Sequence, residues 1–170
     1  MTIAIRREQA GDADAVRQVN ERAFGTPAEA NLVDALRGTD GSLSLVAIVE
    51  DRLVGHIMFT PVTVDDAAGP RVAALAPLSV VPERQRTGIG THLVRAGLAA
   101  CRDAGYAAIV VVGHPEYYPR FGFTPAHAVG LRCEFAVPPD AFMVIPLPGT
   151  PPCPSGMVRY RPEFSAAVDG

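Results

Sequence analysis

The sequence predicts an α/β (α+β) fold in which helices pack on a mixed β-sheet. Three observations support this fold class. Several apolar stretches of strand length follow one another in the first half of the chain, an amphipathic helix is expected at Ile89–Ala104, and the apolar run Ala108–Val112 comes directly after it. Consecutive strands followed by a strand–helix–strand unit are typical of a mixed sheet with helices on it.

The first half of the chain is expected to hold four strands and two helices. Asp12 or Asp14 can cap a helix that runs through Phe24. Pro27 opens a second helix, which Gly38 ends. Apolar and alternating stretches predict the strands at Thr2–Arg7, Leu43–Val49, Leu53–Val64 and Val72–Val81.

In the second half, the helix at Ile89–Ala104 meets Gly105 at the expected C-cap position. The run Ala108–Val112 is apolar on both faces, which is typical of a central strand. Later strands are expected at Ala141–Leu147 and Met157–Tyr160. Seven of the 16 prolines lie between residues 138 and 154, so the segment of about 136–170 is expected to be proline-rich and irregular.

Length and composition predict one cytoplasmic domain that spans residues 1–170. A chain of 170 residues with 48% hydrophobic and 19% charged residues fits a single globular domain. The first residues carry charges and no apolar leader, so we expect no signal peptide. No apolar run reaches the roughly 20 residues that a membrane helix needs. Three scattered cysteines without metal-ligand spacing suit a reducing compartment.

The charge balance argues against a nucleic-acid binder that works by bulk electrostatics. The net charge is −3 and the sequence pI is about 5.8. All basic residues are arginines, because the chain contains no lysine. A Schiff-base lysine or a P-loop lysine is therefore absent from this sequence.

Two glycines at the start of the helix at Ile89–Ala104 indicate a phosphate-binding turn. A helix N-terminus offers unpaired N–H groups and a partial positive charge, and glycine lets phosphate oxygens approach the backbone. A Walker A loop requires a lysine, and the dinucleotide fingerprint requires a third glycine; both are missing. The pattern that remains is Q-x-x-G-x-G, formed by Gln85, Gly88 and Gly90.

This pattern, preceded by Leu78-Ser79-Val80-Val81-Pro82-Glu83, resembles the coenzyme A pyrophosphate loop of the GNAT N-acetyltransferase superfamily. A second segment, Tyr117–Phe123, fits the superfamily's Y-x-x-x-G-F signature at the expected distance downstream. Together with His114 and the residues up to Tyr117, it is most similar to the YhbS-like branch of predicted acetyltransferases. The resemblance covers roughly residues 3–147, and two motifs in the right order are far more specific than one.

The resemblance implies a GNAT fold, with a mixed, mostly antiparallel sheet, splayed central strands and helices on both faces. It implies acetyl-CoA as the cosubstrate and no metal. The acetyl group would pass directly to an amine of a small molecule or peptide. The implied coenzyme-binding residues are Leu78, Ser79, Val80, Gln85, Arg86, Thr87, Gly88, Ile89, Gly90 and Thr91. Arg84 and Arg86 either add charge to this site or are ordinary surface arginines.

The resemblance assigns the general acid to Tyr118, which would protonate the leaving thiolate. Pro119 disfavours a helix at this position, so a turn is expected, and Tyr117 is the alternative acid. His56, His114 and Glu116 are candidate bases, and none is preferred. The residues between Phe24 and Pro27 lie where the superfamily usually borders its acceptor site.

The rival interpretation is a domain that binds acyl-CoA without catalysing transfer and acts as a sensor or interaction module. No nucleic-acid or membrane partner is expected. Monomer and homodimer both remain open, as does the identity of the acceptor.

Overall fold

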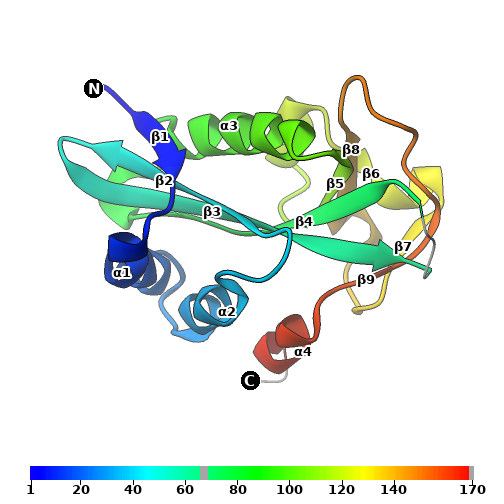
Figure 1. Cartoon of the computed structure of the whole chain (residues 1–170), viewed down its shortest axis with the longest axis horizontal. Coiled ribbons are helices and arrows are strands. Elements are labelled where there is room, and N and C mark those ends of the chain that lie inside the picture. Colours follow the sequence, from blue (N-terminus) through cyan, green and yellow to red (C-terminus); the bar gives the residue numbers. More distant parts are fainter. Residues whose placement is uncertain (66–68, 169–170) are drawn as a thin grey trace. The chain divides into compact units, whose positions relative to one another are not determined.

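The computed structural model describes residues 1–65 and 69–168. Its strands are β1 (Ala4–Arg7), β2 (Leu43–Val49), β3 (Arg52–Val64), β4 (Arg71–Val80), β5 (Tyr106–Val112), β6 (Thr124–Pro125), β7 (Leu131–Cys133), β8 (Phe142–Pro146) and β9 (Gly156–Arg159). Its α-helices are α1 (Ala13–Phe24), α2 (Ala28–Leu36), α3 (Ile89–Asp103) and α4 (Pro162–Val168). Short 3-10 turns join several of them (Figure 1).

The described strands form a mixed and mostly antiparallel sheet, as expected. The strand order is β1-β2-β3-β4-β5-β8-β6, and β9 pairs with both β3 and β7. The β4–β5 and β7–β9 pairs are parallel. The β4–β5 register ends at Leu75 and Val111, although β4 continues to Val80. Because β5 itself ends at Val112, one residue beyond the last pair, the splayed central strands that the resemblance implied stay a prediction.

The chain divides into two compact units, which are described separately. Unit 1 consists of Met1–Phe59, Pro77–Gly97 and Pro162–Gly170, and unit 2 consists of Thr60–Ala76 and Leu98–Arg161. The chain therefore passes between the units several times. Organisation as a single domain stays a prediction.

In unit 1, helices cover both faces of the first strands (Figure 1). A side chain at Gly55 would meet Leu93 and Ile89 of α3. The next residue, His56, contacts Asn20 of α1 instead. Because successive strand residues point to opposite faces, α3 and α1 lie on opposite sides of β3. This arrangement confirms helices on both faces within unit 1.

The start of α1 differs from the expected cap in one respect. Asp12 is the N-cap residue, but its carboxylate makes no cap hydrogen bond to the helix. It accepts two hydrogen bonds from Arg6, at 2.6 and 3.1 Å, and one from the backbone N–H of Gln9 at 2.7 Å. The side chain therefore ties the end of β1 to the turn before the helix.

Unit 2 is built around β5, which is buried along its length except at Val112. It pairs in parallel with β4 and antiparallel with β8, so the predicted central strand is confirmed. Its apolar core consists of Val64, Val72, Ala74, Ala108, Val110, Ala126, Leu131, Phe142, Val144 and Val158. These side chains come mainly from the strands, as the apolar stretches in the sequence predicted.

The proline-rich segment is more regular than expected. The two predicted late strands correspond to β8 and β9, and α4 follows them. Pro162 opens α4 at a position where proline is well tolerated, but its seven residues are too few to show a helical period in the sequence. Within the described residues, no helix combines the length and apolar character that crossing a membrane demands.

Candidate functional site: a backbone loop and a tyrosine turn

The loop between β4 and α3 holds itself in shape through hydrogen bonds to its own backbone. The Gln85 side chain donates to the Val80 carbonyl at 3.0 Å, and the Thr87 hydroxyl donates to the Arg84 carbonyl at 2.5 Å. These bonds fix both ends of a short 3-10 turn at Pro82–Arg84. The glutamine of the motif therefore has a structural task, which is to anchor the loop to the last residue of the strand.

The second half of the loop is open to solvent and presents backbone. Residues 85–88 are exposed, whereas Ile89 is 1% exposed and anchors the helix in the core. Gly88 has a φ of +92°, and a side chain at this position would adopt a strained conformation. Arg86 also has a positive φ, of +63°. Residues held in this conformation by their surroundings cluster at ligand sites.

The first turn of α3 supplies the N–H groups that an anion needs. The N–H of His92 donates to the Gly88 carbonyl at 3.1 Å, which is the start of the helical pattern. The N–H groups that precede it lie in the first turn, where a helix leaves its donors without intrahelical acceptors. Phosphate groups bind at helix starts of this kind in many proteins, and phosphate binding at this one stays a prediction.

The two arginines of the loop, Arg84 and Arg86, differ in their surroundings. Arg84 is held by Glu50, with 3.1 Å between its Nη2 and the Glu50 Oε2. Arg86 is exposed. Glu83, on the same turn, pairs with Arg22 at 2.6 Å, and this partner holds the pKa of the Glu83 carboxyl below its usual range. The charge of Arg84 is therefore already paired with a carboxylate of the protein itself.

The strand segment before the loop, Leu78–Val80, ends β4 within unit 1. The Val81 N–H donates to the Val54 carbonyl at 2.9 Å, which ties this end of β4 to β3. Ser79 is 2% exposed, and its hydroxyl has no hydrogen-bond partner among the described residues. A buried hydroxyl without a partner is uncommon and costs stability.

In unit 2, Tyr118 begins a 3-10 turn that runs to Phe121. Just before this turn, the N–H of Tyr117 donates a hydrogen bond to the His114 carbonyl at 3.0 Å. It ends at Gly122, whose φ is +105°. The turn that was expected from Pro119 is therefore present.

The Tyr118 ring lies in an aromatic cluster with Tyr117, Phe121 and Phe123. Its edge-on contacts with Tyr117 and Phe123 have centroid distances of 5.1 and 5.6 Å. On another side the ring lies against Gly113, where even a methyl group would clash with it. The side chain is 7% exposed, so its orientation is fixed by packing.

Burial raises the pKa of the Tyr118 phenol above its usual value, and the nearby Tyr117 raises it further. The phenol therefore stays protonated at neutral pH, which is the form that a proton donor requires. A raised pKa also makes the phenol a weaker acid than an exposed tyrosine. Tyr117 is only half-buried, and the Arg120 guanidinium stacks 4.4 Å above its ring centre.

The three candidate bases have different surroundings. His114 and Glu116 are exposed residues in the segment before the tyrosine turn. His56 is fully buried in unit 1, and burial followed by the charge of Arg37 lowers the pKa of His56 to about 3. A histidine of this pKa stays neutral at physiological pH and is a poor proton acceptor.

A chain of hydrogen bonds explains how a histidine is accommodated in this core. Asn20 Nδ2 lies 3.2 Å from His56 Nδ1, and Ser44 Oγ lies 2.8 Å from His56 Nε2. Ser44 donates to Glu8 Oε1 at 2.5 Å, and Arg37 Nε donates to the other Glu8 oxygen at 2.8 Å. We call these five residues the buried polar chain.

The hydrogen bonds around His56 indicate which of its two ring nitrogens carries the proton. Asn20 Nδ2 can only donate, so Nδ1 of the imidazole accepts and its proton is on Nε2. The Nε2–H then donates to Ser44, whose own proton goes to Glu8. A base that activates Ser44 would need the opposite arrangement, so the Asn20–His56–Ser44 alignment is not that of a hydrolase triad.

Sequence reasoning missed four members of the buried polar chain. The available signals were weak: Asn20 follows Val16 by one helical turn on the apolar side of α1, and His56 lies in an apolar strand. Glu8 and Arg37 are 29 positions apart, and no local pattern links them.

Among residues 1–65 and 69–168, no group of three or more His, Cys, Asp or Glu side chains is placed to hold a metal ion.

The loop and the Y-x-x-x-G-F turn define a class of protein. The sequence profile of the acetyltransferase (GNAT) family matches residues 13–123 of the chain, which is more than half of its length. The chain therefore belongs to the GNAT family.

Individual relatives are similar over nearly the whole chain. The uncharacterized N-acetyltransferase YjhQ of Escherichia coli K12 is 38% identical over 166 residues, with 92% of each chain covered. YhbS of the same strain is 34% identical over 169 residues, with 95% of this chain and 98% of YhbS covered.

Solved structures of coenzyme complexes are also similar. YhbS from E. coli in complex with CoA matches with a TM-score of 0.85, at 34% identity and 96% and 92% coverage of the two chains. A GNAT family acetyltransferase from Brucella melitensis in complex with acetyl-CoA gives a TM-score of 0.79 at 37% identity, with 96% and 98% coverage.

Proposed function

We propose that this protein transfers an acetyl group from acetyl-CoA directly to the amine of an acceptor molecule. The observation that carries the proposal is the open loop at the start of α3, with exposed residues at 85–88, a glycine at positive φ and the N–H donors of a first helical turn. Two relatives with this fold, at 34% and 37% identity, were solved with CoA and acetyl-CoA.

In this proposal the backbone from Arg86 to Thr91 binds the pyrophosphate, and Gln85 keeps the loop in shape. Leu78, Ser79 and Val80 accompany the pantetheine arm as a neighbouring strand would. A backbone N–H of this segment stabilises the oxyanion that forms when the amine attacks the thioester. The partnerless Ser79 hydroxyl supports a polar contact in the loaded state.

The leaving thiolate needs a proton, and Tyr118 is the proposed donor. Its phenol is held in one orientation by the aromatic cluster and by Gly113. Its pKa is raised by burial, so donation is less favourable than from an exposed tyrosine. Tyr117 stays the alternative acid because it is less buried and lies in the same turn.

A non-catalytic acyl-CoA sensor remains the second candidate, since the loop alone accounts for binding. The fixed orientation of Tyr118 favours the enzyme, because a sensor has no need for an aligned acid. The cytoplasm is the proposed location; no disulfide joins the three cysteines, which suits a reducing compartment.

The decisive experiment is a transfer assay on the wild-type chain. The protein is mixed with acetyl-CoA and a broad panel of amines, and both the released thiol and the acetylated amine are measured. We expect both products in equal amounts. Calorimetry with CoA, ATP and NAD runs in parallel, and we expect binding of CoA alone.

The other outcomes separate the alternatives. Tight CoA binding without transfer to any amine would replace the enzyme by the sensor. Binding of ATP or NAD in place of CoA would overturn the loop assignment itself.

A further inference from the structure

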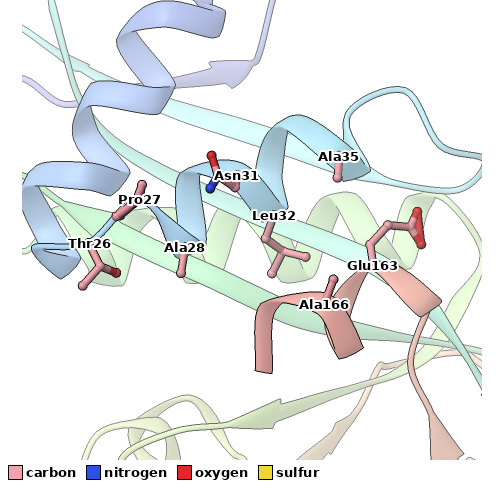
Figure 2. Close-up of a pocket in the computed structure, with 8 residues that line it drawn as sticks. All are labelled: Thr26, Pro27, Ala28, Asn31, Leu32, Ala35, Glu163 and Ala166. Atoms are coloured by element: carbon pink, nitrogen blue, oxygen red, sulfur yellow. The ribbon is translucent and has the colours of Figure 1, made fainter. Parts of the chain in front are cut away.

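Two pockets of unit 1 differ in the groups that line them. The pocket between α2 and α4 has a volume of 610 Å³ and is walled mainly by small side chains (Figure 2). Its one charged residue, Glu163, already has a partner within the protein. The other pocket has a volume of 360 Å³, lies beside the end of β1 and is lined mainly by polar residues. We call it the β1-end pocket; its volume falls in the range of about 300–1,000 Å³ that is usual for small-molecule sites.

The floor of the β1-end pocket is formed by three neighbouring positions of the sheet. Ser44 of β2 pairs with Met58 of β3, and the N–H of Glu8, just after β1, donates to the Ser44 carbonyl at 2.9 Å. Paired positions of adjacent strands carry their side chains on the same face, so these three side chains lie side by side. The rest of the wall includes Arg37 and Thr39, which follow α2.

All three hydroxyl groups of the pocket donate their protons to oxygen atoms of the protein. Thr39 donates to the Leu36 carbonyl and Ser42 to the Thr39 carbonyl, both at 2.8 Å. Ser44 donates to the Glu8 carboxylate at 2.5 Å. Since carbonyl and carboxylate oxygens only accept, the direction of each bond is fixed, and each hydroxyl offers a ligand an oxygen lone pair. The pocket therefore suits a ligand that carries hydrogen-bond donors.

The charges that face the pocket neutralise each other. The Glu8 side chain is 5% exposed and accepts from Arg37 Nε at 2.8 Å. Arg7 also borders the pocket, but it pairs with Leu45, one position from Ser44, so its side chain points to the other face of the sheet. A cationic ligand would meet the charge of Arg37, and an anionic ligand would meet that of Glu8. The lining therefore favours a neutral ligand.

One nitrogen of Arg37 lacks an acceptor. Its Nη1 donates to Asp34 at 2.7 Å, whereas Nη2 is buried and has no hydrogen-bond partner among the described residues. An unmade hydrogen bond of a buried charged group costs stability. A ligand oxygen would accept from Nη2 once the guanidinium tilts toward the pocket. Because a hydroxyl both accepts and donates, it suits Arg37 as well as the lone pairs of Thr39 and Ser42.

We propose that the β1-end pocket binds a neutral polyol, which is a compact molecule with several hydroxyl groups, such as a sugar. The ligand's hydroxyl protons bind to Thr39, Ser42 and Ser44, and one of its oxygens accepts from Arg37. None of the residues that line the pocket belongs to the loop before α3 or to the tyrosine turn. The inference therefore adds a second binding site and goes beyond the proposed acetyl transfer.

The first test measures binding to the wild-type chain by calorimetry, without acetyl-CoA. The probes are glycerol and glucose, with glucuronate and glucosamine as an anion and a cation on the same ring. Glucose should bind at least about fivefold more tightly than glycerol, because each further hydrogen bond contributes about two- to tenfold. Glucuronate and glucosamine should each bind about two- to fivefold more weakly than glucose, the usual range for one exposed charge.

The second test places the ligand in the pocket. Ser42→Ala removes one acceptor and should weaken glucose binding about two- to tenfold. Ser165→Ala is the matched control, because it removes an exposed hydroxyl outside the pocket and should change nothing. Thr39→Val makes the same test if Ser42→Ala fails to fold. Ala10→Phe should fill the pocket and weaken glucose binding at least tenfold. Acetyl-CoA affinity should be unchanged in all four variants, and circular dichroism checks their folding.

The outcomes are independent of acetyl transfer. Glucose binding that Ser42→Ala and Ala10→Phe weaken, and that Ser165→Ala leaves intact, would support the site even if no amine were acetylated. Absent glucose binding, or glucose binding that Ala10→Phe does not change, would overturn the site and leave the acetyltransferase untouched. If glucuronate or glucosamine bound more tightly than glucose and lost this binding in Ala10→Phe, the ligand would be charged and the inference would be wrong.

Discussion

The loop before α3 and the tyrosine turn after β5 are built alike but present different groups. Each contains a short 3-10 turn with a proline, followed by a glycine at positive φ. The loop exposes backbone and fixes it with side chains, as Gln85 and Thr87 show. The turn does the reverse, because it presents the side chain of Tyr118, whose buried ring is held by the rings of Tyr117 and Phe123 and by Gly113. A site made of backbone is therefore sensitive to added bulk, and a site made of one side chain is sensitive to its removal.

The largest effect should come from Tyr118→Phe, which removes one hydroxyl and keeps the ring. If the phenol protonates the thiolate, kcat should fall by roughly 10²–10⁴-fold while acetyl-CoA affinity moves little. The loss should shrink at low pH, where solvent can protonate the thiolate. Steady-state kinetics and calorimetry measure the two quantities.

Tyr117→Phe is the matched control for this variant. It should be mild if Tyr118 is the acid. A mild Tyr118→Phe beside a severe Tyr117→Phe would transfer the role to Tyr117, and full turnover in the double variant would remove the role from the turn.

In the loop, Gly90→Glu should weaken acetyl-CoA binding by at least roughly 10²-fold through bulk and like-charge repulsion. The fold should survive, since Gly90 lies in the first turn of α3 and is partly exposed. Calorimetry measures the affinity. Gly11→Glu adds the same group where a side chain meets open space, so it is the control. Unchanged affinity in Gly90→Glu would contradict the loop assignment.

Gly113→Ala tests whether the turn depends on packing. The added methyl group would strike the Tyr118 ring, and overpacking of this kind typically costs about 1–3 kcal/mol. We expect a lower free energy of unfolding in urea and a lower kcat, because the phenol is displaced. Gly11→Ala, which meets open space, should leave both values unchanged.

The smallest effect should come from Arg86→Asn. Asparagine tolerates the φ of +63° better than arginine does, so the free energy of unfolding should change by no more than about 0.5 kcal/mol. Acetyl-CoA affinity should fall less than about fivefold, as is usual for one exposed charge. A much larger loss of acetyl-CoA affinity, together with a weaker salt dependence of that affinity, would show that Arg86 binds a phosphate directly.

The sequence was most informative where structure depends on local pattern. The strand Ala108–Val112 and the glycine that ends α3 were predicted because apolar periodicity and turn chemistry are local. The motif residues of the loop and the turn were also predicted as short patterns. Their roles in coenzyme binding and proton donation stay predictions.

What the sequence did not reveal depends on contacts between distant residues. Glu8 meets Ser44 across 36 positions, and neither stands out in its own segment. The pocket between α2 and α4 joins residues more than 130 positions apart, and α4 itself is too short to predict. Such features follow from the completed fold.

The buried polar chain couples folding to proton uptake. His56 remains neutral in the folded chain down to a pKa of about 3, but an unfolded histidine takes up a proton near pH 6.5. The unfolded state therefore binds more protons between these values, and stability falls as the pH drops through this window; above it, His56 has no effect. From pH 7.5 to pH 5 the loss is about 2 kcal/mol by proton linkage.

Urea unfolding at the two pH values measures the loss, which should disappear in His56→Gln and persist in the control His127→Gln, whose histidine is exposed. An equal loss in His56→Gln would assign the acid sensitivity to other groups. A histidine hidden among Asn20, Ser44 and Glu8 thus makes the stability of the protein sensitive to acidification below about pH 6.5.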